Sequence, residues 1–250
     1  MRKNSRIVIV GATSSMAEHC ARIWIQEIPD EIYLIGRNKT KLDAIATDLN
    51  VRSPKTKIQT TVMDFTDAKA IDKLAEELCG VLPLDIVLIA HGILPNQKVC
   101  QRDLEVNEES LLINGVSPVL FAEAFAERMT KFNTGTIAVI GSVAGDRGRK
   151  SNYVYGAAKG LVNCYVQGMQ HRFASTGLSV VLIKPGPTDT PMTEEFKKKG
   201  VKLASVEDVA RVVTRGILSG KKCIYAPGKW SLIMMVIRHL PNFVFNKMDI

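Results

Sequence analysis

Long apolar segments are missing from this chain of 250 residues. A helix that spans a bilayer needs about 20 consecutive, mostly apolar residues. The apolar run before Gly11 has four residues, and the run at 232–237 has six. Neither is long enough for a signal peptide or a membrane span, so we expect a cytoplasmic protein.

Cysteine chemistry is also scarce. The chain has five cysteines, an odd number, and no two of them stand at the short spacing of a structural metal site. We therefore predict no metal site and expect reduced thiols, as is usual in the cytoplasm. The five are Cys20, Cys79, Cys100, Cys164 and Cys223.

Acidic residues are fewer than basic ones in this chain. The chain has 33 Lys and Arg against 25 Asp and Glu, which gives a net charge of +8. Such a charge favours anionic partners, for example a phosphorylated cofactor or an anionic membrane surface. The basic residues are scattered and form no known nucleic-acid-binding motif, so we do not expect nucleic acid as a partner.

What the chain does have is a regular alternation of short apolar runs and helical patterns. This alternation predicts an α/β fold, a single doubly wound (Rossmann) domain with a parallel sheet of about seven strands flanked by helices. Residues 1–228 would form this domain, and residues 229–250 an apolar, basic tail. The predicted strands are 7–10, 31–35, 57–63, 85–90, 137–140, 178–183 and 223–226. The predicted helices are 18–28, 39–50, 67–78, 104–132, one that ends near 175, and 206–219, the last with a capping box at 205–208; 95–103 is expected to be a loop.

A turn of small residues follows the first predicted strand. Strand, small-residue turn and helix form a phosphate-binding unit, because small residues let the backbone approach a pyrophosphate and the helix N-terminus supplies N–H groups. An ordinary strand-to-helix turn is the alternative interpretation. The residues that we predict to contact a dinucleotide here are Gly11, Thr13, Ser14, Ser15 and Met16.

The second predicted strand ends without an acidic residue. In a dinucleotide-binding fold an acid at this point binds a free ribose 2′-hydroxyl, whereas an arginine accommodates a 2′-phosphate. This chain has Arg37 there, which predicts NADP(H) rather than NAD(H). A solvated surface arginine is the alternative.

The stretch 136–160 carries the candidate chemistry. Ser142 stands just after a predicted strand, and Tyr155 and Lys159 lie four residues apart in a segment of helix formers. This spacing places the phenol and the ammonium on one helix face. We expect the ammonium to lower the pKa of the phenol, so that Tyr155 exchanges a proton near neutral pH. A tyrosine and a lysine brought together by chance are the alternative.

Together, Ser142, Tyr155, Lys159 and the first turn resemble the short-chain dehydrogenase/reductase family, over about residues 5–228. The resemblance implies hydride transfer between NADP(H) and a ketone or secondary alcohol. Tyr155 would protonate the oxygen, Ser142 would orient it, and Lys159 would hold the nicotinamide ribose. It also implies a homo-oligomer.

The resemblance implies further site residues. Asn114, within the predicted helix 104–132, would hold a relay water that leads to the lysine. A packing asparagine with local backbone bonds is the alternative. The other implied cofactor contacts are Asp64 at the adenine, Ala90 and Gly92 beside the ribose, Pro185, Gly186 and Thr188 at the nicotinamide, and Thr190 at the pyrophosphate.

The chain departs from the family pattern at two turns. Ser15 and Ala17 replace two of the three glycines that usually follow the first strand, and 89–92 replaces an Asn-Asn-Ala-Gly turn. His91 falls in this second turn. We interpret it as a structural turn residue, because Tyr155 already supplies the acid.

The tail from Trp230 onward is rich in apolar residues interrupted by basic ones. It either packs on a partner subunit or lies in a membrane interface, with Trp230, Phe243 and Phe245 at the acyl boundary and basic residues near the headgroups. We favour the membrane. The polar stretch 193–204 is expected to be a substrate lid.

The first turn, the loop after Ser142 and the apolar tail resemble a bacterial branch of the family that includes decaprenylphosphoryl-2-keto-ribose reductases. That resemblance implies a keto-pentose substrate linked through phosphate to a polyprenyl chain. Arg147, Arg149 and Lys150 would bind the phosphate, or form a solvated loop. Two other functions stay open: a carbonyl reductase of small ketone, steroid or acyl substrates that does not use a membrane, and a non-catalytic cofactor-binding protein.

Overall fold

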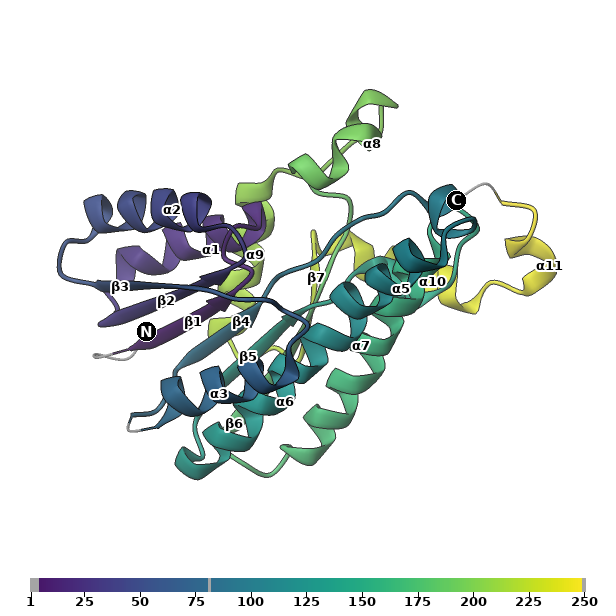
Figure 1. Ribbon diagram of the computed structural model, residues 1–250. Helices are drawn as coiled ribbons and strands as arrows, with labels where there is room; N and C mark the ends of the chain where they lie inside the picture. Colours follow the sequence, from purple (N-terminus) through teal and green to yellow (C-terminus); the bar gives the residue numbers. More distant parts are fainter. Residues whose placement is uncertain (1–4, 81, 249–250) are drawn as a thin grey trace.

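The computed structural model describes residues 5–80 and 82–248, so the outer ends of the predicted domain and tail, 1–4 and 249–250, lie outside the described residues. Seven parallel strands form one sheet in the order β3-β2-β1-β4-β5-β6-β7 (Figure 1). The doubly wound α/β prediction is confirmed. The strands are β1 (Arg6–Val10), β2 (Glu31–Gly36), β3 (Lys57–Val62), β4 (Ile86–Ile89), β5 (Gly135–Ile140), β6 (Leu178–Pro185) and β7 (Cys223–Ala226).

Helices cover both faces of the sheet (Figure 1). On one face lie α1 (Ser15–Trp24), α2 (Lys39–Arg52) and α9 (Val206–Leu218), and on the other lie α3 (Ala68–Cys79), α6 (Ser117–Met129) and α7 (Tyr153–Arg172). Strand β1 serves both layers, since Ile7 and Ile9 pack into the first core and Val8 and Val10 into the second. A strand that is apolar at every position is what burial on both faces requires.

The order of the strands reverses between β1 and β4, which are neighbours in the sheet. In such sheets the crevice at the carboxyl ends of the strands at the reversal is the usual ligand site. Gly11 begins the turn after β1 with φ of +78°, and a Cβ there would come within 2.5 Å of His91 N. Both the backbone angle and the close approach require glycine.

Several elements differ from the sequence predictions. The first helix begins at Ser15 instead of residue 18, and the predicted loop 95–103 contains a short helix, α4 (Gln97–Cys100), capped by the Asn96 side chain. The predicted helix 104–132 is divided into α5 (Leu104–Leu111), a π-helical turn (Leu112–Val116) and α6. At α9 Ser205 caps the helix, but Asp208 pairs with Arg211 and does not complete a capping box.

The C-terminal tail forms two helices, α10 (Lys229–His239) and α11 (Asn242–Phe245), beyond β7 (Figure 1). Helix α10 packs on β7 and buries Met234 completely. Two of the three aromatic residues expected at a membrane are engaged instead: Trp230 lies against Gly186, and Phe245 lies under the Arg147 guanidinium. Phe243 alone of the three is exposed. Within the described part of the chain, no helix combines the length and apolar character needed to cross a bilayer.

Candidate active site

A cavity of about 1130 Å³ lies along the carboxyl ends of the strands. It brings together the segments after β1, β2, β4, β5 and β6 with the start of α7. Most of the residues predicted for the site line it: Gly11, Thr13, Ser14, Ser15, Met16, Arg37, Ala90, Gly92, Ser142, Tyr155, Lys159, Pro185, Gly186, Thr188 and Thr190. Asp64 and Asn114 do not line it.

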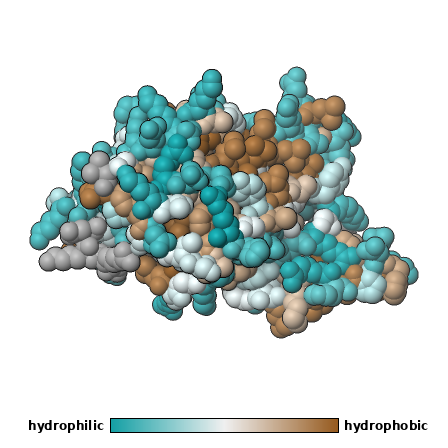
Figure 2. All heavy atoms as spheres, turned by 90° about the horizontal axis from the view of Figure 1, so that it is seen from below, coloured by the Kyte–Doolittle hydropathy of each residue, from teal (hydrophilic) through white to brown (hydrophobic). Residues whose placement is uncertain are grey.

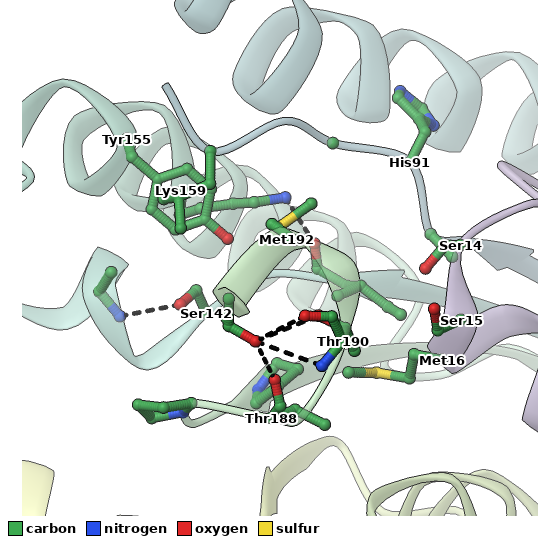
Figure 3. A pocket seen from close by; sticks show the side chains of 18 of the residues that line it. Ser14, Ser15, Met16, His91, Ser142, Tyr155, Lys159, Thr188, Thr190 and Met192 are labelled. Carbon is green, nitrogen blue, oxygen red and sulfur yellow. Dashed lines mark hydrogen bonds between the residues drawn. The ribbon is translucent and has the colours of Figure 1, made fainter. Parts of the chain in front are cut away.

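The two hydroxyls of the candidate catalytic group come from the segment after β5 and from α7. Ser142 follows β5, and its Oγ accepts a hydrogen bond from Ala144 N at 3.0 Å. The Tyr155 hydroxyl projects toward Ser142 from the first turn of α7 (Figure 3). Desolvation raises the pKa of Tyr155 to about 12, and hydrogen bonding with Ser142 opposes this rise. The phenol is therefore protonated at neutral pH.

The expected effect of Lys159 on the Tyr155 pKa was wrong for this structure. Lys159 Nζ donates to Ile140 O at 2.9 Å and lies 5.9 Å from the centre of the Tyr155 ring. Desolvation of the phenol consequently outweighs any stabilisation of the phenolate by the ammonium. Burial also lowers the pKa of Lys159 to about 8, so its charge is lost in the mildly alkaline range.

Asn114 lies in the π-helical turn between α5 and α6. Its Oδ1 accepts from Ile93 N at 2.9 Å, and its Nδ2 donates to Ser110 O at 3.0 Å. A Cβ on Gly92 would meet Asn114 Oδ1 at 2.8 Å and Lys159 Nζ at 3.8 Å. The amide therefore lies behind Gly92, next to the lysine, and its role in holding a relay water stays a prediction.

The end of the cavity near β1 and β2 has the features of a nucleotide site. Ser14 precedes α1 and makes no side-chain capping bond, which leaves the N–H groups of the first helical turn for a ligand. Arg37 is exposed, and its guanidinium lies 5.9 Å from the centre of the Phe65 ring. Lys41, which the sequence analysis missed, lines the cavity on the same side. These residues fit a dinucleotide with a phosphorylated ribose.

Asp64 does not line the cavity, although Arg37 is near enough to help the hydrogen bonds from Thr66 lower the pKa of its carboxyl. Its Oδ1 accepts from the backbone N and the hydroxyl of Thr66, both at 2.9 Å. Phe65, the next residue, lines the cavity in its place. The segment after β3 thus reaches the cavity as expected, and the contact of Asp64 with an adenine stays a prediction.

His91 is buried beside the site and points away from Ser142 and Tyr155 (Figure 3). Ser117 Oγ donates to Phe65 O at 2.6 Å, so it accepts from His91 Nε2 at 2.8 Å. The proton is therefore on Nε2, and Nδ1 has no partner among the described residues. Burial lowers the pKa of His91 to about 3, which makes it a neutral structural residue.

The segment after β6 lies across the cavity from the first turn. Thr188 is buried and donates to Gly186 O at 2.9 Å. A Cβ on Gly186 would fall within 1.9 Å of Trp230 Nε1, so this glycine lets the C-terminal tail pack directly behind the site.

The three basic residues of the loop after Ser142 differ in their position relative to the cavity. Arg147 Nη1 donates to Ile237 O and Leu240 O, both at 2.6 Å, so the expectation that Arg147 binds a substrate phosphate is wrong. Arg149 does line the cavity, and its Nη2 donates to Val143 O at 3.2 Å. Burial lowers the pKa of Arg149. Lys150 does not line the cavity.

The sequence predicted a lid over the cavity but did not identify which apolar residues of that segment line it. The expected lid, 193–204, contains α8 (Glu194–Lys198), which projects from the molecule (Figure 1). Met192, Phe196 and Val201 line the cavity there. These three residues are separated by polar residues and lysines, without the periodicity of a helix or strand, so the sequence did not indicate that they line the cavity.

Comparisons with known proteins agree with this fold. The family model of short chain dehydrogenases matches residues 5–200. The chain is 28% identical over 214 residues to an uncharacterized oxidoreductase of Staphylococcus aureus (strain USA300), over 86% of this chain and 91% of that one.

Two solved structures are similar in fold. A short chain dehydrogenase from Burkholderia cenocepacia J2315 in complex with NADP has a TM-score of 0.82 at 16% identity, over 98% of this chain and 97% of that one. A short-chain dehydrogenase from Sphingobium yanoikuyae in complex with NADPH has a TM-score of 0.80 at 21% identity, over 98% and 96%.

Proposed function

This chain belongs to the short-chain dehydrogenase/reductase family of oxidoreductases, and we propose that it is an NADPH-dependent reductase of a ketone. The observation that carries the proposal is the meeting of Ser142, Tyr155 and Lys159 in the cavity that also contains the small-residue turn after β1. When bound, the nicotinamide would supply the hydride. The protein supplies binding, orientation and a proton.

In the proposed mechanism the substrate oxygen lies between two hydroxyls. Ser142 orients it by hydrogen bonding, and Tyr155, which is protonated at neutral pH, donates the proton as negative charge develops on the oxygen. Lys159 carries its charge below a pKa of about 8 and would hold the nicotinamide ribose. Asn114 would bind a water molecule in a proton relay that leads to Lys159.

The preference for NADPH over NADH is a separate proposal. The support for it is the exposed Arg37 guanidinium together with Lys41 at the β2 end of the cavity, where none of the described lining residues is acidic. A 2′-phosphate adds charge that these two cations would offset. Solved structures of similar fold hold NADP, NADPH or NAD, so the support for this choice is the pair of cations alone.

For the substrate we propose a lipid-linked keto-sugar, in particular a keto-pentose joined through phosphate to a polyprenyl chain. Arg149 supports an anionic substrate, since it adds a positive charge to the cavity lining, with Asp146 as the nearby carboxylate that attracts it. Met192, Phe196 and Val201 supply an apolar rim for the lipid. The phosphate of such a substrate would thus contact Arg149, and its polyprenyl chain would contact the apolar rim.

We also propose peripheral contact of the tail with an anionic membrane, and a homo-oligomer. For the oligomer, the support is an apolar face over α5 and α7. Figure 2 shows brown side chains gathered where these helices lie in Figure 1. The exposed leucines of these two helices and the turn after α5 are Leu104, Leu111, Leu112 and Leu161.

The test is consumption of NADPH with a panel of ketones, keto-sugars and a polyprenyl-phosphate keto-pentose, with and without anionic vesicles. Turnover of the lipid-linked sugar, increased by vesicles, would support the whole proposal. Turnover of small ketones alone, indifferent to vesicles, would leave the mechanism and remove the lipid substrate. NADPH binding without turnover of any compound would favour a non-catalytic cofactor-binding protein.

The cofactor preference is tested by kcat/KM with NADPH and NADH. We expect Arg37→Ala to reduce the NADPH preference at least about tenfold, since each lost charge-assisted contact contributes about 1.5–3 kcal/mol. An enzyme that prefers NADH before the substitution would contradict the proposal.

A further inference from the structure

A buried carboxylate, Asp146, ends the loop that carries Ser142. Asp146 is the last residue of the turn Val143–Asp146, and only 2% of its side chain is exposed. Lys184 Nζ donates to its Oδ1 at 2.5 Å, and the Lys184 side chain is 5% exposed. Removing one partner of so buried an ion pair is costly, because the other charge then stays buried and unpaired.

Two more donors complete the hydrogen bonding of this carboxylate. Tyr225 Oη donates to Oδ2 at 2.8 Å, and Asn163 Nδ2 donates to Oδ1 at 3.1 Å. Lys184 belongs to β6, Tyr225 to β7 and Asn163 to α7. One side chain thus joins the serine loop to three other elements.

Two of these elements carry parts of the active site. Lys184 directly precedes Pro185 and Gly186, which line the cavity. Asn163 is one helical turn beyond Lys159 on α7. The loop also touches the α7 backbone, because a Cβ on Gly145 would lie 2.5 Å from the Lys159 carbonyl carbon.

We propose that Asp146 is a positioning residue, whose carboxylate holds the Ser142 loop in a fixed place relative to α7 and to the end of β6. Ser142, Tyr155 and the segment after β6 then keep the mutual geometry that the reaction needs. The kinetic consequence rests on the proposed reductase function, whereas the fixing of the loop does not.

The kinetic test uses Asp146→Asn and Lys184→Met. A small displacement of catalytic groups costs up to about 100-fold in rate, so we expect each variant to lose at least about tenfold in kcat. The KM for the ketone and the Kd for NADPH should stay within about twofold, because the binding surfaces are retained. A fall in thermal stability with unchanged kcat per folded enzyme would overturn the proposal.

The double variant Asp146→Asn/Lys184→Met removes both charges of this ion pair, so neither partner stays buried without the other. Its loss in kcat should be smaller than the product of the two single losses, and still at least about tenfold. Losses that multiply would show that the two residues act separately and would contradict the proposal. If Asp146→Asn does not fold, the double variant carries the test alone, and kcat within twofold of the unaltered enzyme then overturns it.

Asp208→Asn is the matched control, because it removes the same kind of charge from an ion pair with Arg211 in which both side chains are exposed. We expect no change in kcat for it. Amide hydrogen exchange over residues 142–150 supplies a readout that needs no substrate: it should be faster in Asp146→Asn and unchanged in Asp208→Asn. If the unaltered enzyme reduces no ketone, the proposed function fails, and the exchange rates still decide whether Asp146 fixes the loop.

Discussion

Burial, more than pairing of opposite charges, sets the protonation of the residues in the candidate site. Desolvation raises the pKa of Tyr155 to about 12, and it lowers the pKa of Lys159 to about 8 and that of His91 to about 3. The sequence indicated Tyr155 and Lys159 through their spacing. It did not indicate the direction of the Tyr155 shift, because that direction depends on how much protein surrounds the phenol.

His91 should make the fold sensitive to acid. Its pKa in the folded protein, about 3, lies below the unfolded value of about 6.5, so the stability it contributes is complete above pH 6.5 and is lost as pH falls. Each pH unit below that value costs about 1.4 kcal/mol, which amounts to about 2 kcal/mol between pH 6.5 and pH 5. Urea unfolding at both pH values measures this loss.

The variant His91→Gln keeps a hydrogen-bond donor for Ser117 but cannot titrate. Between pH 6.5 and pH 5, the free energy of unfolding of this variant should therefore fall by about 2 kcal/mol less than that of the unaltered protein. The control His171→Gln removes an exposed histidine and should keep the full acid sensitivity. Equal pH dependence in His91→Gln and in the unaltered protein would refute the assignment of a buried neutral imidazole.

At the scale of elements, the strands were the most predictable part. Their continuous apolar runs are required by burial on both faces, and all seven were found within a few residues of the predicted bounds. Helix boundaries were less predictable: α4 depends on a cap from Asn96, and the π-helical turn at Leu112–Val116 has no local signature. Contacts between distant segments, such as Arg147 with α10, were not predictable at all.

Arg147 should hold the end of α10 in place. Its guanidinium caps the carbonyls of Ile237 and Leu240, which the helix leaves without internal partners. We expect Arg147→Ala to destabilise 229–248 by on the order of 2 kcal/mol, since the lost hydrogen bonds come from a charged donor. Amide hydrogen exchange would be faster in that segment and unchanged in β1.

The control for this prediction is Arg238→Ala, which removes an exposed arginine of α10 itself. Its exchange rates should stay close to those of the unaltered protein. Protection of 229–248 that survives Arg147→Ala would mean that packing of Met234 and Trp230 alone holds the tail.

At the scale of the whole molecule, charge is unevenly distributed. No acidic residue occurs from 209 to 248, whereas Lys229, Arg238 and Lys247 are exposed on or beside the tail helices. Exposed apolar side chains accompany them, Leu232 at 65% and Phe243 at 72%. A surface that combines apolar and basic groups matches an anionic bilayer.

We therefore predict that the protein sediments with anionic vesicles, more weakly at high salt, and not with neutral ones. The substitutions Leu232→Ser and Phe243→Ser together should lower the bound fraction at least about fivefold, through loss of buried apolar area. Val51→Ser, which alters an equally exposed apolar residue on α2, is the control and should bind normally. Equal binding of all three proteins would exclude the tail as the contact.

The most direct test of the central claim compares the unaltered enzyme with Tyr155→Phe. Two quantities are measured: NADPH binding, by the fluorescence of the nicotinamide, and a single turnover of a ketone. Because Tyr155 supplies the proton, the variant should bind NADPH within about twofold and lose at least about 100-fold in turnover, as loss of a general acid predicts. A variant that reduces the ketone at near-normal rate would contradict the proposed reductase mechanism.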